Sequence, residues 1–241
     1  MLNQRNYTTG GIGDWDVLME GVYRDLHMVN TGQVLVNLGL VHSDGEWLNY
    51  WDRWLEKMRG FGWRRFGWYV WHQGPGMPGD WNGRLAPSHE FIFHFNREAR
   101  QANKIVECKC AGVIHGGQGM RQADGVINNY TAAGKPIQDF KIPDSVIDVP
   151  RASGNQTGHP AVFPVALPAF LMRSWTDAGE LCYEPFAGSG TQFIAAHQLG
   201  RVCYGMEIAP EYCAVILERV AQMDLKPELV GIEKAAPAER P

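Results

Sequence analysis

The stretch Glu184-Pro185-Phe186-Ala187-Gly188-Ser189-Gly190-Thr191 decides the fold of this chain. It follows the short apolar run Leu181-Cys182-Tyr183 and opens a helical pattern, which predicts a strand, a glycine turn and a helix. Gly188 and Gly190 have no side chain and can adopt positive φ, so a ligand can come close to bare backbone at this turn. The stretch therefore indicates a site for a nucleotide-type cofactor.

The residues after the turn predict the rest of a βαβ unit. Phe193, Ala196 and Leu199 recur at helical spacing before Gly200, which is a helix-stop signal. Residues 201–206 then form a second apolar run that we expect to be a strand.

An acidic residue, Glu207, stands at the end of this second strand, 17 positions after Gly190. An acid roughly 20 residues after a glycine turn can receive ribose hydroxyls. A tight turn in an α/β core without any ligand is the alternative. NAD fits less well, because the dinucleotide fingerprint needs a small residue where this chain has Phe193.

Three segments in order resemble one family, the DNA amino-methyltransferases. Residues 184–191 resemble its S-adenosylmethionine loop, Asp-Pro-Phe-x-Gly-x-Gly-Thr, with Glu184 in place of the first Asp. Upstream, residues 159–167 resemble the preceding His-Pro-x-x-x-Pro segment, and downstream residues 205–212 resemble the Gly-x-Glu-x-x-x-x-Tyr signature. The resemblance covers residues 159 to 219.

The resemblance implies an S-adenosyl-L-methionine-dependent DNA N-methyltransferase and assigns roles within the cofactor site. Phe163 would line the methionine end of the cofactor, and Glu207 would hold the ribose. The loop would cradle the amino-acid part of the cofactor through Glu184, Pro185, Phe186, Gly188, Gly190 and Thr191. No metal is expected in the site.

The order of these segments is similar to that of the permuted β group, in which the cofactor half follows the catalytic half. The resemblance therefore implies an α/β, Rossmann-like sheet that is circularly permuted. We expect residues 1–96 to be a catalytic-half remnant, 97–151 a target-recognition insert and 152–223 the S-adenosylmethionine-binding half. Residues 224–241 are expected to form a flexible tail.

The N-terminal half predicts further strands and one amphipathic helix. Apolar runs predict strands at residues 33–41, 66–72 and 89–95, and residues 74–79 form a glycine- and proline-rich loop that would lie near the substrate cleft of a related fold. Residues 46–59 carry large apolar side chains at helical spacing, which predicts one buried helix face. This face would consist of Trp47, Trp51, Trp54 and Met58; stacking of these indoles on bases is the alternative.

Residues 97–151 are rich in Gly, Asn and Gln and carry eight Lys or Arg against six Asp or Glu, a balance of +2. The whole chain has a net charge of −4, so the remainder holds −6. Positive charge is thus concentrated where DNA phosphates would lie. A solvated loop with ordinary charge scatter is the alternative. Cys108, Cys110 and His115 lack a second ligand pair at finger spacing, so zinc is not predicted.

Composition fits an intracellular enzyme. The 241 residues are 45% apolar, enough for a sizeable core, and no stretch is long and apolar enough to span a membrane. We expect reduced cysteines and a cytoplasmic location. Double-stranded DNA is the expected partner, no membrane is expected, and a homodimer is left open.

The catalytic tetrapeptide of the resembled family, Asp, Asn or Ser followed by Pro-Pro and an aromatic, does not occur in this sequence. Residues 3–15 resemble what family members carry immediately after it, so Met1 falls at the motif or just beyond it. We therefore hypothesise an N-terminally truncated gene product or a misassigned start, lacking two strands of the sheet. With the motif expected upstream of Met1, no catalytic residue is named. Such a chain would have open strand edges.

The sequence is compatible with four functions. The first is a DNA methyltransferase acting on adenine N6 or cytosine N4, and the second is an inactive relative that binds the cofactor, DNA or both. The third is an RNA or small-molecule methyltransferase on the same fold. The fourth is a nicotinamide oxidoreductase.

Overall fold

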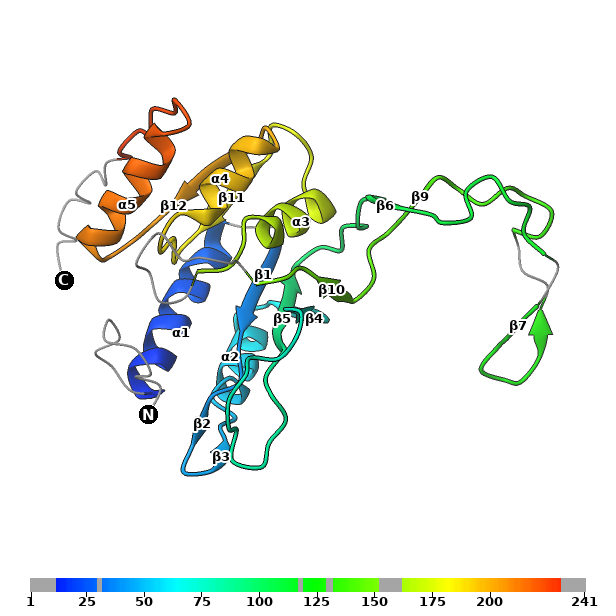
Figure 1. Ribbon diagram of the computed structural model, residues 1–241, viewed down its shortest axis with the longest axis horizontal. Helices are drawn as coiled ribbons and strands as arrows, with labels where there is room; N and C mark the ends of the chain where they lie inside the picture. Colours follow the sequence, from blue (N-terminus) through cyan, green and yellow to red (C-terminus); the bar gives the residue numbers. More distant parts are fainter. Residues whose placement is uncertain (1–11, 30–31, 117–118, 129–131, 152–161, 231–241) are drawn as a thin grey trace, which may run out of the picture.

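The computed structural model describes residues 12–29, 32–116, 119–128, 132–151 and 162–230. A four-stranded sheet in the order β1-β5-β4-β10 forms the centre of the N-terminal half (Figure 1). Its strands are β1 (Gln33–Leu38), β5 (His89–Asn96), β4 (Arg64–His72) and β10 (Val146–Asp148). β5 is antiparallel to both β1 and β4, whereas β10 is parallel to β4.

The two faces of this sheet are covered by different helices, which gives three layers. On one face, α1 (Ile12–Val29) and α2 (Asp52–Gly60) pack over β1 and β5. Trp54 and Met58 of α2 are fully buried there. On the other face, α3 (Ala166–Trp175) contributes Leu167 to a second cluster with Trp71 and Ile92. Alternate residues of each strand thus feed opposite layers, as the pleat requires.

A buried polar network crosses the four-stranded sheet. His94 is fully buried, and burial lowers its pKa to about 4, so the imidazole is neutral at physiological pH. Its Nε2 lies 2.9 Å from the Gln33 side-chain oxygen, an acceptor, and its Nδ1 lies 2.9 Å from the Tyr69 hydroxyl. Nε2 therefore carries the proton and Nδ1 accepts from tyrosine, an arrangement that favours the observed pairing of β1, β5 and β4.

The expected strands are confirmed, but the expected helix over residues 46–59 is wrong at its start. Residues 46–51 are not helical: β3 (Glu46–Trp47) pairs with β2 (His42–Ser43), and α2 begins at Asp52. The reason is the Asp44-Gly45 turn, in which both residues have positive φ (53° and 85°) and close a two-residue hairpin. Trp47 is consequently 56% exposed and not part of the core.

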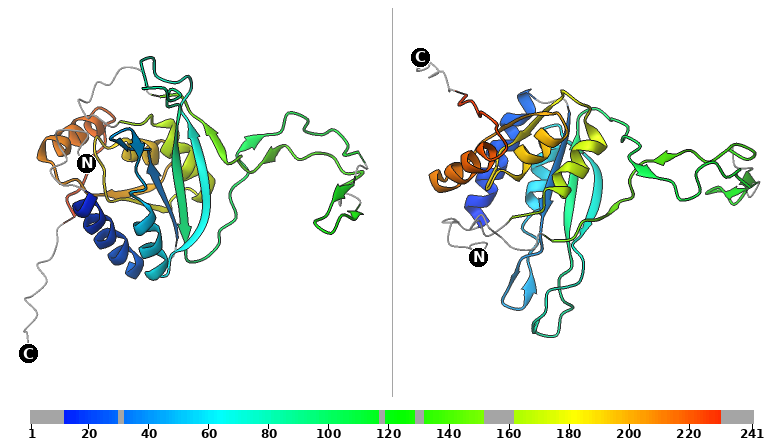
Figure 2. Two further views of the ribbon diagram at one scale, coloured as in Figure 1. Left: turned by 90° about the horizontal axis from the view of Figure 1, so that it is seen from below. Right: turned by 45° about the horizontal axis from the view of Figure 1, so that its top comes forward.

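The described parts of residues 97–145 form an extended arm that projects from the body (Figures 1 and 2). Its limbs pair at β6 (Val106–Glu107) with β9 (Phe140–Lys141), and β7 (Met120–Arg121) pairs with β8 (Ile127–Asn128) farther out. Contacts of two residues fix the outgoing limb: the Asn103 amide donates to the Ser174 carbonyl (2.8 Å), and Arg100 pairs with Glu180 (2.7 Å) and Asp177 (2.9 Å). The arm is therefore anchored to the C-terminal half.

The C-terminal half contains the predicted βαβ unit. β11 (Leu181–Glu184) pairs in parallel with β12 (Val202–Gly205), with α4 (Thr191–Gln198) between them and α5 (Pro210–Ala221) after them. Among the described strands, β1 pairs only with β5 and β11 only with β12. The parallel pair is thus a separate sheet.

Candidate cofactor site

The glycine turn lies between β11 and α4, as the sequence predicts. Gly188 and Gly190 have φ of 52° and 76°, the left-handed region that glycine adopts without strain. A Cβ on Gly190 would lie 2.9 Å from the Ile216 side chain of α5. A side chain at residue 190 would therefore collide with α5, and only glycine fits at this position of the turn.

Glu207, the predicted ribose acceptor, lies at the end of β12 and reaches the turn. Its carboxylate accepts from the Gly188 amide (2.7 Å) and from the Ala209 amide (2.9 Å). The Ala187 amide also donates across the strand pair, to the Met206 carbonyl (2.9 Å). Each carboxylate oxygen of Glu207 retains a further lone pair that can accept a hydroxyl.

Glu184 occupies the other end of the turn. Its carboxylate accepts from the Phe186 amide (2.9 Å) and from the Gln192 side chain (2.6 Å). Burial raises the pKa of the Glu184 carboxyl to about 7, although both hydrogen bonds favour the charged form. Near neutral pH this carboxyl is therefore poised between its two protonation states.

The turn does not resemble a phosphate cradle, because four of its amides already have acceptors. The amides of Phe186, Ala187 and Gly188 donate as described, and the Gly190 amide donates to the Ala187 carbonyl (2.8 Å). Carboxylates stand at both ends of the turn, at Glu184 and Glu207. Two acids beside a close-approach backbone favour a ligand with positive charge and disfavour a pyrophosphate.

The remaining predicted residues fall into two groups. Pro185 is partly buried, Phe186 is 40% exposed at the mouth of the turn, and Thr191 is buried as the first residue of α4. Phe163 instead packs at the edge of the cluster around Trp71 and Leu167. Within the described residues, no hydrogen bond or ring contact joins Phe163 to the turn, so its role at the methionine end stays a prediction.

Two expectations from the sequence fall outside the described residues. The catalytic tetrapeptide is expected upstream of Met1, and residues 1–11 are not among those that the structure describes. The truncated start therefore stays a hypothesis, and the site still has no named catalytic residue. The His159-Pro160 start of the upstream segment also lies outside the described ranges, which resume at residue 162.

Sequence reasoning missed three residues that shape this site. Gln192 holds Glu184, and Arg219 of α5 donates to the Ser189 carbonyl and side chain (3.1 Å to Oγ). Tyr23 of α1 is buried, which raises its pKa well above its usual range, and the nearby Glu184 carboxylate adds to this rise. The interactions of Arg219 and Tyr23 join elements that are far apart in the sequence, so no local pattern predicts them. Gln192 lies only eight residues from Glu184, at the start of the predicted helix, and could have been found from the sequence.

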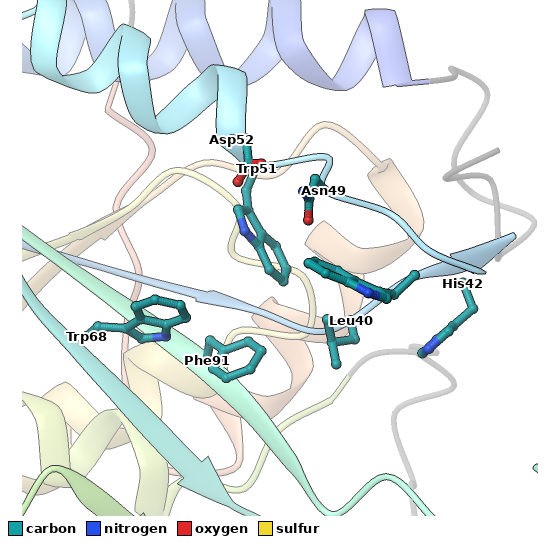
Figure 3. Close-up of a pocket in the computed structure, with 8 residues that line it drawn as sticks. Leu40, His42, Asn49, Trp51, Asp52, Trp68 and Phe91 are labelled. Carbon is teal, nitrogen blue, oxygen red and sulfur yellow. The ribbon is translucent and has the colours of Figure 1, made fainter. Parts of the chain in front are cut away.

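An open hollow lies at the β2–β3 hairpin, and none of the turn residues lines it (Figure 3). It is an open pocket of about 450 Å³. Half of its lining residues are tryptophan or phenylalanine; the lining comes from Leu40, His42, Trp47, Asn49, Trp51, Asp52, Trp68 and Phe91. The exposed Trp47 therefore belongs to this hollow.

Cysteines and acidic clusters add no metal site in the described part of the chain. All five cysteines are free thiols, and no group of three or more His, Cys, Asp or Glu in the described ranges could hold a metal ion. Within the same ranges, no helix is long and apolar enough to cross a membrane.

Comparison with known families shows to which family the chain belongs. The family model for N6/N4 methyltransferases, described as DNA methylase, matches residues 10–218. The chain belongs to this family. The resemblance carried by residues 184–191 and their neighbours is thus confirmed.

Among curated relatives, the chain is 27% identical over 159 residues to the Type II methyltransferase M.XycI of Xanthomonas campestris pv. cyanopsidis, covering 64% of this chain and 45% of that protein. It is 40% identical over 62 residues to the orphan methyltransferase M.BamHII of Bacillus amyloliquefaciens, covering 26% of this chain and 23% of that protein. This DNA methylase family member therefore matches less than half of the length of either relative.

Solved structures share the fold. The PvuII DNA methyltransferase, named as cytosine-N4-specific, superposes with a TM-score of 0.64 at 18% identity, covering 90% of this chain and 74% of that one. The M1.HpyAVI complex with S-adenosylmethionine gives a TM-score of 0.58 at 18% identity, covering 86% of this chain and 84% of that one. The Rossmann-like methyltransferase fold expected from the sequence is confirmed.

Proposed function

We propose that this DNA methylase family member binds S-adenosyl-L-methionine at the glycine turn and transfers its methyl group to adenine N6 or cytosine N4 in double-stranded DNA. The observation that carries the proposal is the turn between β11 and α4, which combines left-handed glycines with carboxylates at both ends. S-adenosylmethionine supplies an activated methyl group on a positively charged sulfur. A cation suits a turn flanked by two acids.

Within this proposal each polar group has one task. Glu207 holds the ribose hydroxyls with its free lone pairs while the Gly188 and Ala209 amides fix its orientation. Glu184, held by Gln192, faces the positive charge of the amino-acid part. Phe163 lines the methionine end. In the same proposal, residues 152–223 form the cofactor half and residues 1–96 a remnant of the catalytic half. The proposed flexible tail, 224–241, lies largely outside the described residues.

The arm within residues 97–151 is the proposed DNA-recognition element. Lys109, Arg121 and Lys135 are exposed and, within the described residues, form no ion pair. Such cations can neutralise phosphates on a duplex and release counterions. Arg100, by contrast, is occupied at the root of the arm by Glu180 and Asp177.

A second candidate function is binding of cofactor and DNA without methyl transfer. It is favoured by one observation, the absence of an Asp/Asn/Ser-Pro-Pro-aromatic tetrapeptide from the printed sequence. An exocyclic amino group is a weak nucleophile because its lone pair is delocalised into the ring, so transfer needs groups that accept its hydrogens. Both candidates use the same cofactor turn.

Calorimetric titration of residues 1–241 with S-adenosylmethionine and with NAD tests the cofactor. We expect binding of S-adenosylmethionine only, and at least roughly tenfold weaker binding by Glu207→Gln, because hydrogen bonds to a charged group are lost. Glu218→Gln, an exposed acid on α5, is the matched control and should bind as the wild type does. Tighter binding of NAD, or an unchanged Glu207→Gln variant, would contradict the proposal.

Methyl transfer is measured separately. Duplex DNA incubated with the protein and isotope-labelled S-adenosylmethionine is digested, and its nucleosides are separated by mass. Label in N6-methyladenine or N4-methylcytosine supports the methyltransferase. Cofactor binding with unlabelled nucleosides supports the second candidate.

A further inference from the structure

The loop of residues 74–88, between β4 and β5, is a closed two-limbed projection (Figures 1 and 2). At its base, the Gln73 amide donates to the Ser88 carbonyl (2.7 Å). Farther out the limbs touch, since a Cβ on Gly76 would lie 2.6 Å from the Cβ of Ala86. Near the tip, Trp81 Nε1 donates to the Met77 carbonyl (3.0 Å). These contacts hold the loop in one shape.

Arg151 fixes both ends of this loop to the body. Its guanidinium donates to the Gln73 side-chain oxygen (2.9 Å) and to the carbonyls of Pro75 (3.1 Å) and Pro87 (2.8 Å). Its own amide donates to the Gln73 carbonyl (3.2 Å). Gln73 is buried, so its bond to the guanidinium is partly shielded from water, whereas the bonds to the Pro75 and Pro87 carbonyls lie at the exposed surface. Lysine, with a single ammonium, could not reproduce this planar fork.

The same arginine stands where the chain returns from the arm. The return limb enters the sheet at β10, where the Val70 amide donates to the Ser145 carbonyl (2.9 Å), and Arg151 follows β10. The arm thus rejoins the body near the base of the loop. Figure 1 shows the loop below the sheet and the arm to its side, so the two projections diverge from one region.

The outer surface of the loop carries two large apolar side chains, Met77 and Leu85, one cation, Arg84, and one acid, Asp80, whose carboxylate accepts from the Asn82 amide (2.8 Å). Leu85 is 95% exposed and Met77 is 50% exposed, and Arg84 beside them is also exposed. A rigid loop that holds large apolar side chains in water indicates a contact surface. Leucine and methionine are among the side chains that enter DNA grooves and part base steps, and arginine contacts phosphates.

We propose that the 74–88 loop is a second DNA-contacting element, which places Met77 and Leu85 in a groove of the duplex, and that Arg151 is its positioning residue. This proposal rests on the proposed function, because its partner is the same DNA duplex that the arm is proposed to bind. Met77 and Leu85 supply apolar contact, which releases no counterions, whereas the cations of the arm supply salt-dependent contact.

The test is fluorescence anisotropy of a labelled DNA duplex with residues 1–241 over a series of salt concentrations. The Met77→Ser/Leu85→Ser variant should bind roughly tenfold more weakly, the expected effect of losing buried apolar side chains, with an unchanged slope of log K against log salt. Leu229→Ser, equally exposed at 98% but outside the loop, is the matched control and should bind normally. Lys109→Gln/Arg121→Gln should instead reduce the slope by about two.

Variants at Arg151 test its positioning role. Arg151→Lys and Arg151→Met should both weaken duplex binding, leave S-adenosylmethionine binding unchanged and raise hydrogen exchange across the 74–88 loop. Unchanged cofactor binding also shows that each variant is folded.

The outcomes separate the two proposals. A wild-type chain that binds S-adenosylmethionine but no duplex would overturn the DNA partner together with the loop. A wild-type chain that binds duplex, with binding equally tight after the Met77→Ser/Leu85→Ser change, would overturn the loop alone. Rescue of duplex binding by Arg151→Lys would overturn the role given to the guanidinium fork.

Discussion

Glu184 is the residue whose protonation should control cofactor affinity. Its carboxyl has a pKa of about 7, raised by burial, and it lies at the end of the turn where the proposed cation binds. Only the charged form attracts a cation. A group with this pKa is about one-tenth ionised at pH 6, so affinity for S-adenosylmethionine should rise roughly tenfold between pH 6 and pH 8.

Calorimetry in buffers of different ionisation enthalpy measures this coupling directly. Near pH 7, binding should release a fraction of a proton, because the bound cation favours the ionised carboxylate. Glu184→Gln should abolish both the proton release and the rise with pH. A rise that persists in Glu184→Gln would place the titrating group elsewhere.

The raised pKa of Glu184 also makes a prediction for the free protein. The folded state holds this proton up to about pH 7, whereas the unfolded state releases it near the ordinary value of 4.5. The contribution of Glu184 to folding is therefore present at low pH and lost as pH rises from 4.5 to 7. Glu184→Gln should melt higher than the wild type at pH 8, by roughly 2–4 °C if about 1 kcal/mol is recovered, and not at pH 4.

At the scale of elements, the strand-turn-helix over β11 and α4 depends on Gly190. Its φ of 76° and the 2.9 Å that would separate an added Cβ from the Ile216 side chain leave alanine both strained and crowded. Gly190→Ala should cost about 1–3 kcal/mol of folding free energy, measured by urea unfolding. Gly60→Ala, with nothing within 4 Å of its Cβ and no positive φ, is the control and should cost nothing comparable.

The same elements show what sequence can predict. The βαβ unit over β11, α4 and β12 was predictable because its signals are local: apolar runs, glycines at the turn and an acid after the second strand. Residues 46–51 were mispredicted because the tryptophan spacing competed with the Asp44-Gly45 hairpin signal, and the hairpin prevailed. Within a short segment, a two-residue turn with positive φ outweighs helical periodicity.

The candidate site was predictable only in part for a related reason. The motif spacing predicted Glu207 after the second strand of the unit, and the structure shows in addition that its carboxylate accepts from the Gly188 amide. Other interactions join elements that are far apart in the chain: those of Arg219 with Ser189, of Tyr23 with Glu184, and of Arg151 with Gln73. No local pattern marks which arginine of a sequence will meet which carbonyl.

At the scale of the whole molecule, stability depends on the layer between the sheet and the helices α1 and α2. Trp54 is fully buried there and contacts Tyr23, Phe93 and Phe95 through its ring. Trp47, by contrast, is 56% exposed at the open pocket. The two tryptophans, which the sequence placed on one helix face, should therefore differ sharply in their contribution to folding.

Trp54→Ala should cost about 3–5 kcal/mol, the range for removing a buried aromatic side chain, and Trp47→Ala less than about 1 kcal/mol. Urea unfolding followed by circular dichroism measures both. Trp54→Phe is a milder variant for the case that Trp54→Ala does not fold. Phenylalanine keeps most of the ring contacts, and it removes no hydrogen bond because Nε1 of Trp54 has no partner within the described residues. Its cost should fall between the other two, and a Trp47→Ala variant as unstable as Trp54→Ala would contradict this assignment of the core.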